Sequence, residues 1–297
     1  MSFDITIAFD KAEYLNPQAR LFISTLKDNI PKDTILHVVT NRTDEDEIVK
    51  YIQENINSKF YFIEKSDELK SRCRYMLNCF KIKTNKEWII KMELDMLTLK
   101  HLSALENILE ADLDCVLEPE NRRIYSGAFE KRLWRSIHKA MGFPNPTQKI
   151  IFRENNEEGL ALFGTGMICV RKELLDKINK EWIPLTKKAE PWLNMNVHSN
   201  EQAFTGLVLN SGWRWKIYKD IYKYNPIGHF RKGDFPSTNL IDDCKLPEDT
   251  VIFDYHRPKW LMHVAKYNKN VGDIICDNNK YIPEDWWKST NDEFQEK

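Results

Sequence analysis

The sequence predicts an α/β protein with a mostly parallel β-sheet that helices cover on both faces. Over the first 120 residues, short apolar runs typical of strands alternate with segments whose apolar residues recur every three or four positions, as in helices. The connections between these segments are short, and this alternation favours a parallel sheet built from βαβ units. We expect one domain over residues 1–270, with a mixed second half, and a polar C-terminal tail at 271–297.

Composition narrows the class of protein. The 297 residues carry 44 Lys and Arg against 45 Asp and Glu, so the chain lacks the basic footprint of a nucleic-acid-binding protein. No apolar run reaches the roughly 18 residues that a membrane-spanning helix needs, and the first residues do not resemble a signal peptide. The six cysteines form no C-x-x-C pair, which favours reduced thiols and a cytoplasmic protein.

In the first half, apolar runs predict strands at residues 4–9, 34–39, 60–63, 87–97 and 115–117. Asn16-Pro17 predicts a helix start, with the asparagine as N-cap and the proline in the first turn. Helical spacing predicts further helices from Thr43, over 69–80 and near 101–110. The carboxyl ends of the strands in such a sheet are the usual place for a ligand.

The second half is less regular. We expect helices over 128–141, through Trp182 to Pro184, and from Ser199 to Gly212. Strand-like segments cover residues 160–170, 213–218 and 251–256, and residues 144–158 and 186–198 are predicted loops.

Glycine usage excludes two common nucleotide-binding motifs from the first half. The chain has ten glycines, and none precedes Gly127. A Rossmann fingerprint or a P-loop needs glycines just after its first strand, so that the backbone can approach phosphate. If this half binds a nucleotide, it must use side chains and a metal ion.

The 87–97 strand carries the main candidate site. Strand alternation predicts that Lys91, Glu93 and Asp95 share one face. Two neighbouring carboxylates at the end of an apolar strand repel each other, and Mn²⁺ or Mg²⁺ would relieve that repulsion. Taken alone, Glu93-x-Asp95 is more simply a solvated acidic edge. Asp10 also lies at a strand end, and this agreement favours a functional site.

Three further groups are candidates. Asp254 and His256 share a strand face, and residues 256–260 place an imidazole and the Lys259 ammonium in a predicted tight turn, which could equally be a solvated turn. Glu201 and Gln202 begin a helix near the predicted pocket, although Ser199 with Gln202 is also a capping box, which needs no function. Arg72 on the 69–80 helix could reach a phosphate, and a solvent-exposed position is the alternative.

Together these features resemble the GT-A glycosyltransferases, most closely the glycogenin-like family 8, whose fold is Rossmann-like. The likeness covers residues 3 to about 263. It rests on five segments: Ala8-Phe9-Asp10-x₃-Tyr14 with the following helix; Glu93-Leu94-Asp95 at the D-x-D position, where Glu93 replaces the first Asp; Phe163-Gly164-Thr165-Gly166; Asn200-Glu201-Gln202; and His256-Arg-Pro-Lys259-Trp260, a shortened closing motif.

The resemblance implies a glycosyltransferase that moves a sugar from a UDP-sugar to an unknown glycan, protein or small-molecule acceptor, with Mn²⁺ or Mg²⁺ and with retention at the anomeric carbon. The first 120 residues would bind the donor, and residues 121–270 the acceptor. The implied roles are these: metal ligands Glu93, Asp95 and His256; donor contacts Phe9, Asp10, Tyr14, Arg72, Glu93 and Gly164; catalytic groups Gln202, Glu201 and Lys259.

Two alternatives remain open at this point. A sugar-phosphate nucleotidyltransferase uses similar metal chemistry, but the glycine-rich loop that it needs after the first strand is missing. A GT-A-like module that binds a nucleotide-sugar without transferring the sugar would carry the same motifs.

Overall fold

The computed structural model describes residues 1–64, 76–119, 127–152, 158–193, 198–219, 222–224, 246–255, 258–283 and 286; the side chains of Gly127, Phe129 and Lys259 are outside the description. The strands are β1 (Phe3–Phe9), β2 (Leu36–Thr40), β3 (Ser58–Phe62), β4 (Trp88–Lys91), β5 (Met96–Thr98), β6 (Cys115–Pro119), β7 (Lys149–Ile151), β8 (Glu158–Leu160), β9 (Phe163–Arg171), β10 (Trp215–Ile217), β11 (Lys223–Tyr224) and β12 (Ile252–Asp254). The α-helices are α1 (Leu15–Leu26), α2 (Glu47–Asn55), α3 (Gly127–Met141), α4 (Leu175–Ala189), α5 (Ser199–Asn210), α6 (Pro258–Ala265) and α7 (Lys269–Asp277).

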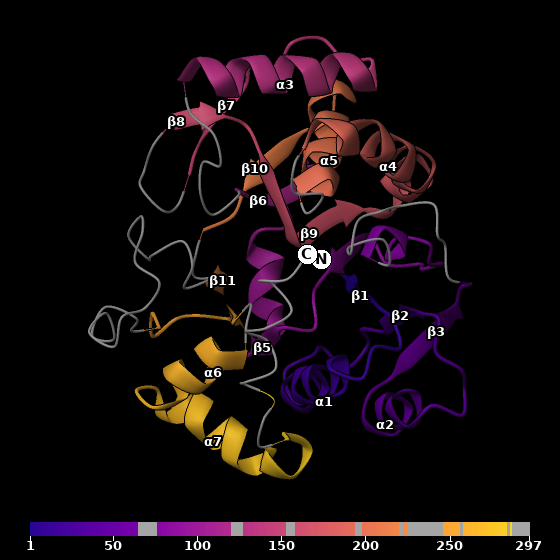
Figure 1. The fold of residues 1–297 in the computed structure, drawn as a ribbon. Coiled ribbons are helices and arrows are strands. Elements are labelled where there is room, and N and C mark those ends of the chain that lie inside the picture. Colours follow the sequence, from indigo (N-terminus) through magenta and orange to yellow (C-terminus); the bar gives the residue numbers. More distant parts are fainter. Residues whose placement is uncertain are drawn as a thin grey trace.

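A seven-stranded sheet in the order β10-β6-β9-β4-β1-β2-β3 forms the centre of the molecule (Figure 1). The β1–β2, β2–β3, β1–β4 and β6–β10 pairs are parallel. Only β9 runs antiparallel to both of its neighbours, β4 and β6, among the described strands of this sheet. The predicted α/β class with a mostly parallel sheet and a mixed second half is therefore confirmed.

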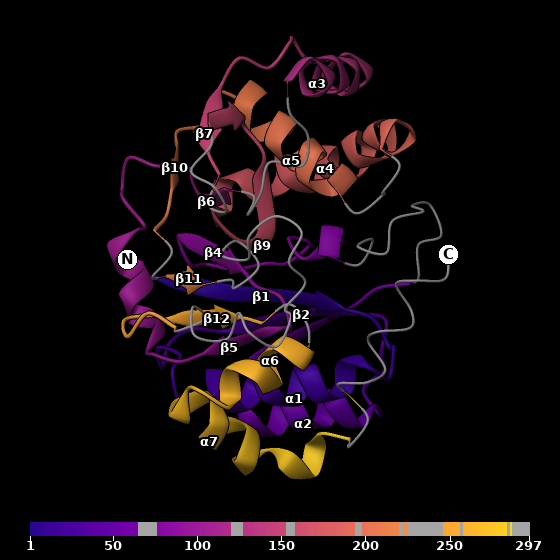
Figure 2. The same ribbon diagram turned by 60° about the vertical axis from the view of Figure 1, so that its left-hand side comes forward.

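Helices cover the sheet on both faces (Figures 1 and 2). The helices α1, α2, α6 and α7 lie on one side, and α3, α4 and α5 lie on the other. One core cluster joins β1 and β4 to α1 and α2 through residues such as Ile5 and Trp88. A second joins β6 and β9 to α3, α4 and α5, and a third lies under α6 and α7. Burial on both faces explains why the central strands read as nearly continuous apolar runs.

The predicted strand over 87–97 is divided in two, and this is the main correction to the sequence analysis. The chain leaves the main sheet after Lys91, and Leu94 and Asp95 form a turn. It then enters β5, which pairs antiparallel with β12 in a separate three-stranded sheet. Glu93 and Asp95 therefore project from a bend between two sheets and do not share one strand face.

Several helix boundaries differ from prediction for local reasons. The N-cap of α2 is Asp46, whose carboxylate accepts a hydrogen bond from the Ile48 amide, so the helix does not begin at Thr43. Tyr14 is the N-cap of α1, which places Pro17 within the first turn. Pro184 does not end α4, because it lies on the exposed side of the helix, where water can bind the carbonyl that loses its partner.

Other segments are more ordered than predicted. Residues 102–107 form a 3₁₀-helix, and the predicted 144–158 loop contains β7 and the first residue of β8. Pro258 begins α6, so residues 258–260 are helical where a tight turn was expected. The described part of the predicted 69–80 helix is a 3₁₀ turn at Met76–Asn78.

The segment after residue 270 adds to the core. Helix α7 buries Val271 and Ile275, and a 3₁₀-helix follows at Asn279–Tyr281. Trp286 is buried against Tyr255, with ring centroids 6.5 Å apart. In the described part of the chain, no helix has both the length and the apolar character needed to cross a lipid bilayer.

Replacing Trp286 by Ala tests whether the C-terminal segment stabilises the domain. Removal of a fully buried indole should lower the free energy of unfolding by about 3 kcal/mol. The matched variant Trp192→Ala removes the same side chain from an exposed position, 48% accessible, and should cost less than about 0.5 kcal/mol. Urea denaturation of both variants decides the point, and equal midpoints would show that the segment contributes nothing.

Candidate functional site

Polar and charged side chains meet at the ends of β4 and β6 and at the start of β9. The three-stranded sheet β11-β12-β5 contributes further charged side chains to the same place. Lys91 and Glu93 come from the end of β4, and Glu118 comes from β6. Lys223 lies on β11, and Asp254 on β12. This is the carboxyl edge of the parallel strands, the position at which ligands bind in such sheets.

Lys91 is completely buried and neutralises Glu93. Its Nζ lies 2.7 Å from Glu93 Oε1, and it also donates to the Thr165 carbonyl oxygen at the start of β9. A buried ammonium needs such partners, because its desolvation is otherwise expensive. The first carboxylate of the Glu93-x-Asp95 pair is therefore held by a cation of the protein itself.

Lys223 plays the same role for two other carboxylates. Its Nζ lies 2.8 Å from Glu118 Oε2 and 2.7 Å from Asp254 Oδ2, and the Tyr218 hydroxyl donates a further hydrogen bond to Glu118. Burial by itself would lower the pKa of Lys223, but the neighbouring Asp254 and Glu118 raise it above its ordinary value. Lys223 consequently keeps its positive charge inside the protein.

Asp95 belongs to the same group of carboxylates but forms no ion pair with a described residue, and the charge of Lys223 lowers its pKa only in part. Its side chain is partly exposed, but its Oδ1 is buried and has no hydrogen-bond partner in the described part of the chain. Burial, followed by the negative charges of Asp254 and Glu93, raises the pKa of Asp95 well above its usual range. Among the described residues, four carboxylates (Glu93, Asp95, Glu118 and Asp254) thus lie near two ammonium groups, and full ionisation of these six groups leaves a surplus of two negative charges.

The described residues alone do not complete a metal site. Among them, no three His, Cys, Asp or Glu side chains are grouped so that they could hold a metal ion. Of the predicted ligands, Glu93 and Asp95 are adjacent in the bend, and His256 lies outside the described residues. Arg72 and the Lys259 side chain also lie outside them, so their predicted roles stay predictions.

Gly164 and Gly166 make room for the buried charges. A Cβ at Gly164 would lie 2.5 Å from Glu118 Oε1, and a Cβ at Gly166 would lie 2.5 Å from Lys223 Nζ. Both contacts are far shorter than real Cβ atoms allow. Gly164, predicted to contact the donor, therefore has a packing role beside Glu118, and its contact with a nucleotide stays a prediction.

The first turn of α5 brings the predicted catalytic pair to this edge. Asn200 donates a hydrogen bond from Nδ2 to Thr165 Oγ1, 3.0 Å away, which places the turn beside β9. Gln202 is buried, and its Nε2 has no hydrogen-bond partner. Glu201 Oε2 lies 2.6 Å from Nδ1 of His198, a residue that the sequence analysis did not single out.

The capping-box explanation for Gln202 is wrong. The N-cap of α5 is His198, which makes no side-chain capping bond, and Ser199 is already the first residue of the helix. A capping box would need Ser199 as the N-cap and Gln202 at the third helical position. The buried amide of Gln202 therefore needs another explanation.

The predicted nucleotide-binding turn after β1 is held by Arg42, which the sequence analysis did not identify. Arg42 is buried and donates to the Asp10 carbonyl oxygen at 3.0 Å, to Asn16 Oδ1 at 2.7 Å, and to both carboxylate oxygens of Asp46. Its guanidinium also lies over the Phe9 ring, 5.3 Å from the centroid. The only local signal was an arginine two residues after a strand, four residues before an aspartate.

Phe9 and Asp10 are consequently fixed, and Tyr14 is exposed at the surface. Phe9 is buried at the end of β1, and the Asp10 carboxylate accepts a hydrogen bond from the Ala12 amide. Tyr14, 53% accessible, precedes α1 at the outer side of the same turn. The turn therefore combines a rigid backbone with an accessible aromatic ring at the carboxyl edge of β1.

Comparison with solved structures shows that glycosyltransferases share this fold. Mouse xyloside xylosyltransferase 1 matches 86% of this chain and 97% of its own, with a TM-score of 0.52 and 13% identity. Galactosyltransferase LgtC, in complex with donor and acceptor sugar analogues, matches 95% of this chain and 98% of its own, with a TM-score of 0.57 and 13% identity. Glycosyltransferase GlyE of Streptococcus pneumoniae TIGR4 matches 93% of this chain and 63% of its own (TM-score 0.56, 12% identity).

The expected GT-A architecture and the structural resemblance to family 8 glycosyltransferases are thereby confirmed at the level of the fold. The sequence itself matches no protein-family model and no curated protein.

Asp95→Asn should stabilise the metal-free protein. The pKa of Asp95 is higher in the folded protein than in the unfolded protein. The protein therefore has its full stability at pH values below the unfolded-state pKa of Asp95, and it loses stability as the pH rises through the folded-state pKa. Removing the charge should therefore raise the unfolding midpoint in chelator, and more at pH 7.5 than at pH 5. For domains near this size, 1 kcal/mol corresponds to roughly 2–4 °C, which scanning fluorimetry resolves. A lower midpoint at both pH values would contradict the uncompensated-charge description.

Gly166→Ala should destabilise the protein by about 2–3 kcal/mol, because the added methyl group displaces the Lys223 ammonium from its two carboxylates. Gly212→Ala is the matched variant: it has open space but a φ of +70°, so backbone strain alone should cost about 1 kcal/mol. Chemical denaturation of both variants measures the difference. Equal losses would mean that Lys223 can move at little cost.

Proposed function

We propose that this protein is a metal-dependent glycosyltransferase that moves a sugar from a UDP-sugar to an acceptor, with retention at the anomeric carbon. One observation carries the proposal: at the carboxyl edge of the sheet, Asp95 has a carboxylate oxygen without a hydrogen-bond partner among the described residues, in a cluster whose described groups carry two surplus negative charges when fully ionised. A divalent cation is the complement that such a cluster lacks. The fold shared with LgtC and xyloside xylosyltransferase 1 supports the reaction class.

The donor set fits Mn²⁺ or Mg²⁺, both of which accept carboxylate oxygen. Asp95 would be the principal ligand, with Glu93 beside it and His256 as the predicted third ligand. When bound, the metal would stabilise the negative charge of the departing diphosphate. Lys91 would keep Glu93 in position beside the metal, and Lys223 would hold Glu118 and Asp254 in place.

The nucleoside would bind at the turn after β1. Arg42 fixes the backbone of this turn through Asp10 and Asn16, so little ordering remains for the donor to induce. We assign Phe9, Asp10 and Tyr14 to the nucleoside, and Arg72 and Gly164 to the rest of the donor. Because the first half lacks a glycine-rich loop, the phosphates would depend on the metal and on side chains.

The transferred sugar would lie against the first turn of α5. Gln202 Nε2 and Asn200 Oδ1 are buried polar atoms without partners among the described residues, and hydroxyl groups of a sugar could satisfy both. An active-site mutant of LgtC in which a glutamine is replaced by glutamate shows that a glutamine belongs to the active site of that protein. We assign Gln202 and Glu201 to the anomeric carbon region and Lys259 to the diphosphate.

Two alternatives make different predictions. A binding module without transferase activity would bind UDP with Mn²⁺ but release no UDP from any UDP-sugar. A sugar-phosphate nucleotidyltransferase would instead form a nucleotide-sugar from a nucleoside triphosphate and a sugar phosphate. The missing glycine-rich loop argues against the latter.

UDP binding should depend on the metal and on Asp95. We expect UDP with Mn²⁺ to raise the melting temperature, since a ligand at a hundred times its Kd stabilises by about 2.7 kcal/mol. The shift should disappear in chelator and in Asp95→Asn. Release of UDP from a panel of UDP-sugars should likewise be lost in this variant. GDP and GDP-sugars serve as the competing donor class.

Asp176→Asn is the control, because Asp176 is an exposed carboxylate on α4. It should leave both the thermal shift and UDP release unchanged. If UDP bound equally well in chelator, or if Asp95→Asn kept wild-type turnover, the metal-site proposal would fail. Binding of UDP and Mn²⁺ without any UDP release would favour the binding module.

A further inference from the structure

The exposed face of α3 carries an unneutralised row of cations. Lys131, Arg132, Arg135 and Lys139 are all exposed, and their spacing places them within about 100° of arc on one side of the helix. None of them forms an ion pair with a described carboxylate. The only acidic residue of α3, Glu130, is buried on the other side. Because the whole chain has a net charge of −1, this row does not follow from overall composition.

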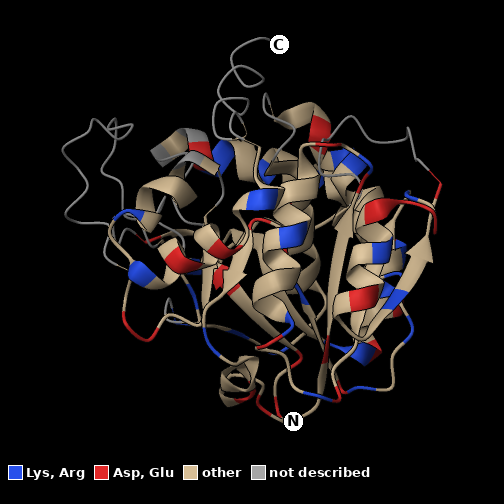
Figure 3. Ribbon diagram, turned by 90° about the horizontal axis from the view of Figure 1, so that it is seen from below, with Lys and Arg blue, Asp and Glu red and all other residues tan. Residues whose placement is uncertain are grey.

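The opposite side of the molecule is different. Figure 3 views it from below, the side of α1, α2, α6 and α7, and shows Lys and Arg interspersed with Asp and Glu. Charged helices there include close pairs such as Arg20 with Glu47 and Lys269 with Asp273. The concentration of positive charge on the exposed face of α3 is therefore a local property of that face.

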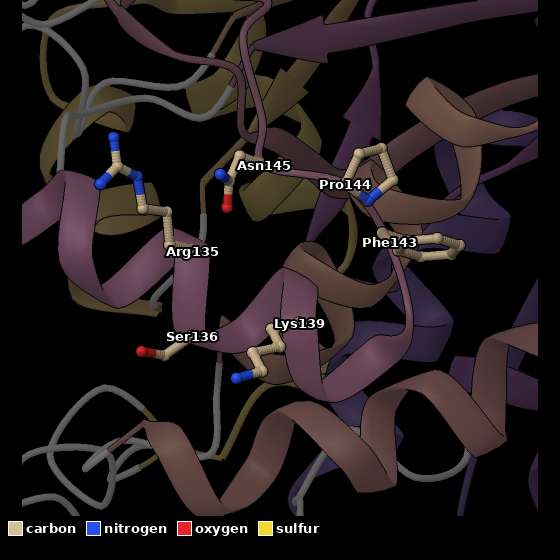
Figure 4. A pocket seen from close by; sticks show the side chains of 6 residues that line it. All are labelled: Arg135, Ser136, Lys139, Phe143, Pro144 and Asn145. Carbon is tan, nitrogen blue, oxygen red and sulfur yellow. The ribbon is translucent and has the colours of Figure 1, made fainter.

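Two of these cations line a surface depression of about 460 Å³ (Figure 4). Arg135, Ser136 and Lys139 project from α3, and Phe143, Pro144 and Asn145 line it from the segment that follows the helix. The guanidinium can bind an anionic group through two parallel hydrogen bonds, and the ammonium can bind a second as a point charge. Ser136 and Asn145 add uncharged hydrogen-bonding groups, and Phe143 and Pro144 add apolar ring surfaces.

The wall of this depression is rigidly built. Helix α3 ends in a Schellman motif, in which Gly142 adopts a φ of +86°, its amide donates to the Lys139 carbonyl oxygen, and the Phe143 amide donates to the His138 carbonyl oxygen at 2.8 Å. The buried His138 then donates from Nδ1 to the Pro144 carbonyl oxygen at 3.1 Å.

Phe143 is fixed from its other side by α5. A Cβ at Gly206 would lie 2.9 Å from the Phe143 ring, so that only glycine allows the ring to lie this close to the helix. The Phe143 ring and the backbone around it therefore need little further ordering, which lowers the entropic cost of binding a ligand there.

We propose that this face binds an acidic oligosaccharide. The Arg135 and Lys139 cations match its sulfate, phosphate or carboxylate groups, the hydroxyl and amide groups match its hydroxyls, and the Phe143 and Pro144 rings match the apolar faces of its sugar rings. If the protein is the glycosyltransferase proposed above, the oligosaccharide is the distal part of its acceptor, because α3 belongs to the half predicted to bind the acceptor and packs on α5, whose first turn lies at the candidate site.

A membrane surface is a poorer match for this face. Membrane-binding helices insert an apolar face, whereas that of α3, with Trp134, Ile137 and Met141, is buried in the protein core. Nucleic acid would need a longer basic footprint than the roughly 12 Å from Lys131 to Lys139.

The test uses a labelled heparin-derived hexasaccharide, an uncharged counterpart that has been desulfated, N-acetylated and carboxyl-reduced, and vesicles of phosphatidylglycerol and phosphatidylcholine. The sulfated probe should bind the wild-type protein, more weakly as salt rises, and Arg135→Gln combined with Lys139→Gln should weaken it at least about tenfold. Lys172→Gln combined with Lys180→Gln removes the same charge from exposed positions directly after β9 and on α4, and should change little.

Three results would overturn the proposal: no binding of the sulfated probe, equal binding of the uncharged probe, or equal losses in the two double variants. Binding of vesicles instead of the sulfated probe, lost in the α3 variant, would identify a membrane surface and also overturn it. All measurements omit nucleotide and Mn²⁺, so their failure is separate from failure of the UDP experiments. Unchanged melting temperatures of both variants verify that each is folded.

Discussion

The arrangement of this protein depends on how it neutralises carboxylates that are buried at the carboxyl edge of its sheet. Two lysines, Lys91 and Lys223, lie inside the protein and bind Glu93, Glu118 and Asp254. Each lysine links elements that are distant in sequence, since Lys91 joins β4 to β9, and Lys223 joins β11 to β6 and β12. Loss of either ammonium would leave buried carboxylates unpaired, which is more costly than the pairs are stabilising.

This constraint also leaves one carboxylate available. Asp95 lies beside the neutralised groups, and its Oδ1 receives no hydrogen bond. A protein whose only task was stability would have little use for such a residue, because burial and its acidic neighbours oppose its ionisation. An unfavourable charge of this kind, at the carboxyl edge of a parallel sheet, is a common property of functional sites. The negative charge of Asp95 therefore both destabilises the fold and gives this edge of the sheet its capacity to bind a cation.

The two halves of the molecule contribute different features to the carboxyl edge of the sheet. In the first half, Arg42 fixes the backbone of the turn after β1, and so prepares a surface that presents Tyr14. In the second half, α5 brings Asn200 and Gln202 to the edge at its first turn and supports Phe143 with Gly206 further along. One helix thus connects the candidate site with the cationic face of α3. That connection is what makes an extended acceptor a reasonable ligand for both surfaces.

The sequence by itself determined the α/β class, the parallel first half and the order of most elements, because alternating and helical apolar patterns are local and survive folding. It also indicated Asp95, through its short spacing from Glu93. Only the tertiary structure decided which charges meet: Glu118 and Lys223 are 105 positions apart, and neither carries a local signal. The division of the 87–97 strand was likewise set by pairing of β5 with β12, more than 150 positions away. Contacts between distant segments depend on the whole chain, and no local pattern encodes them.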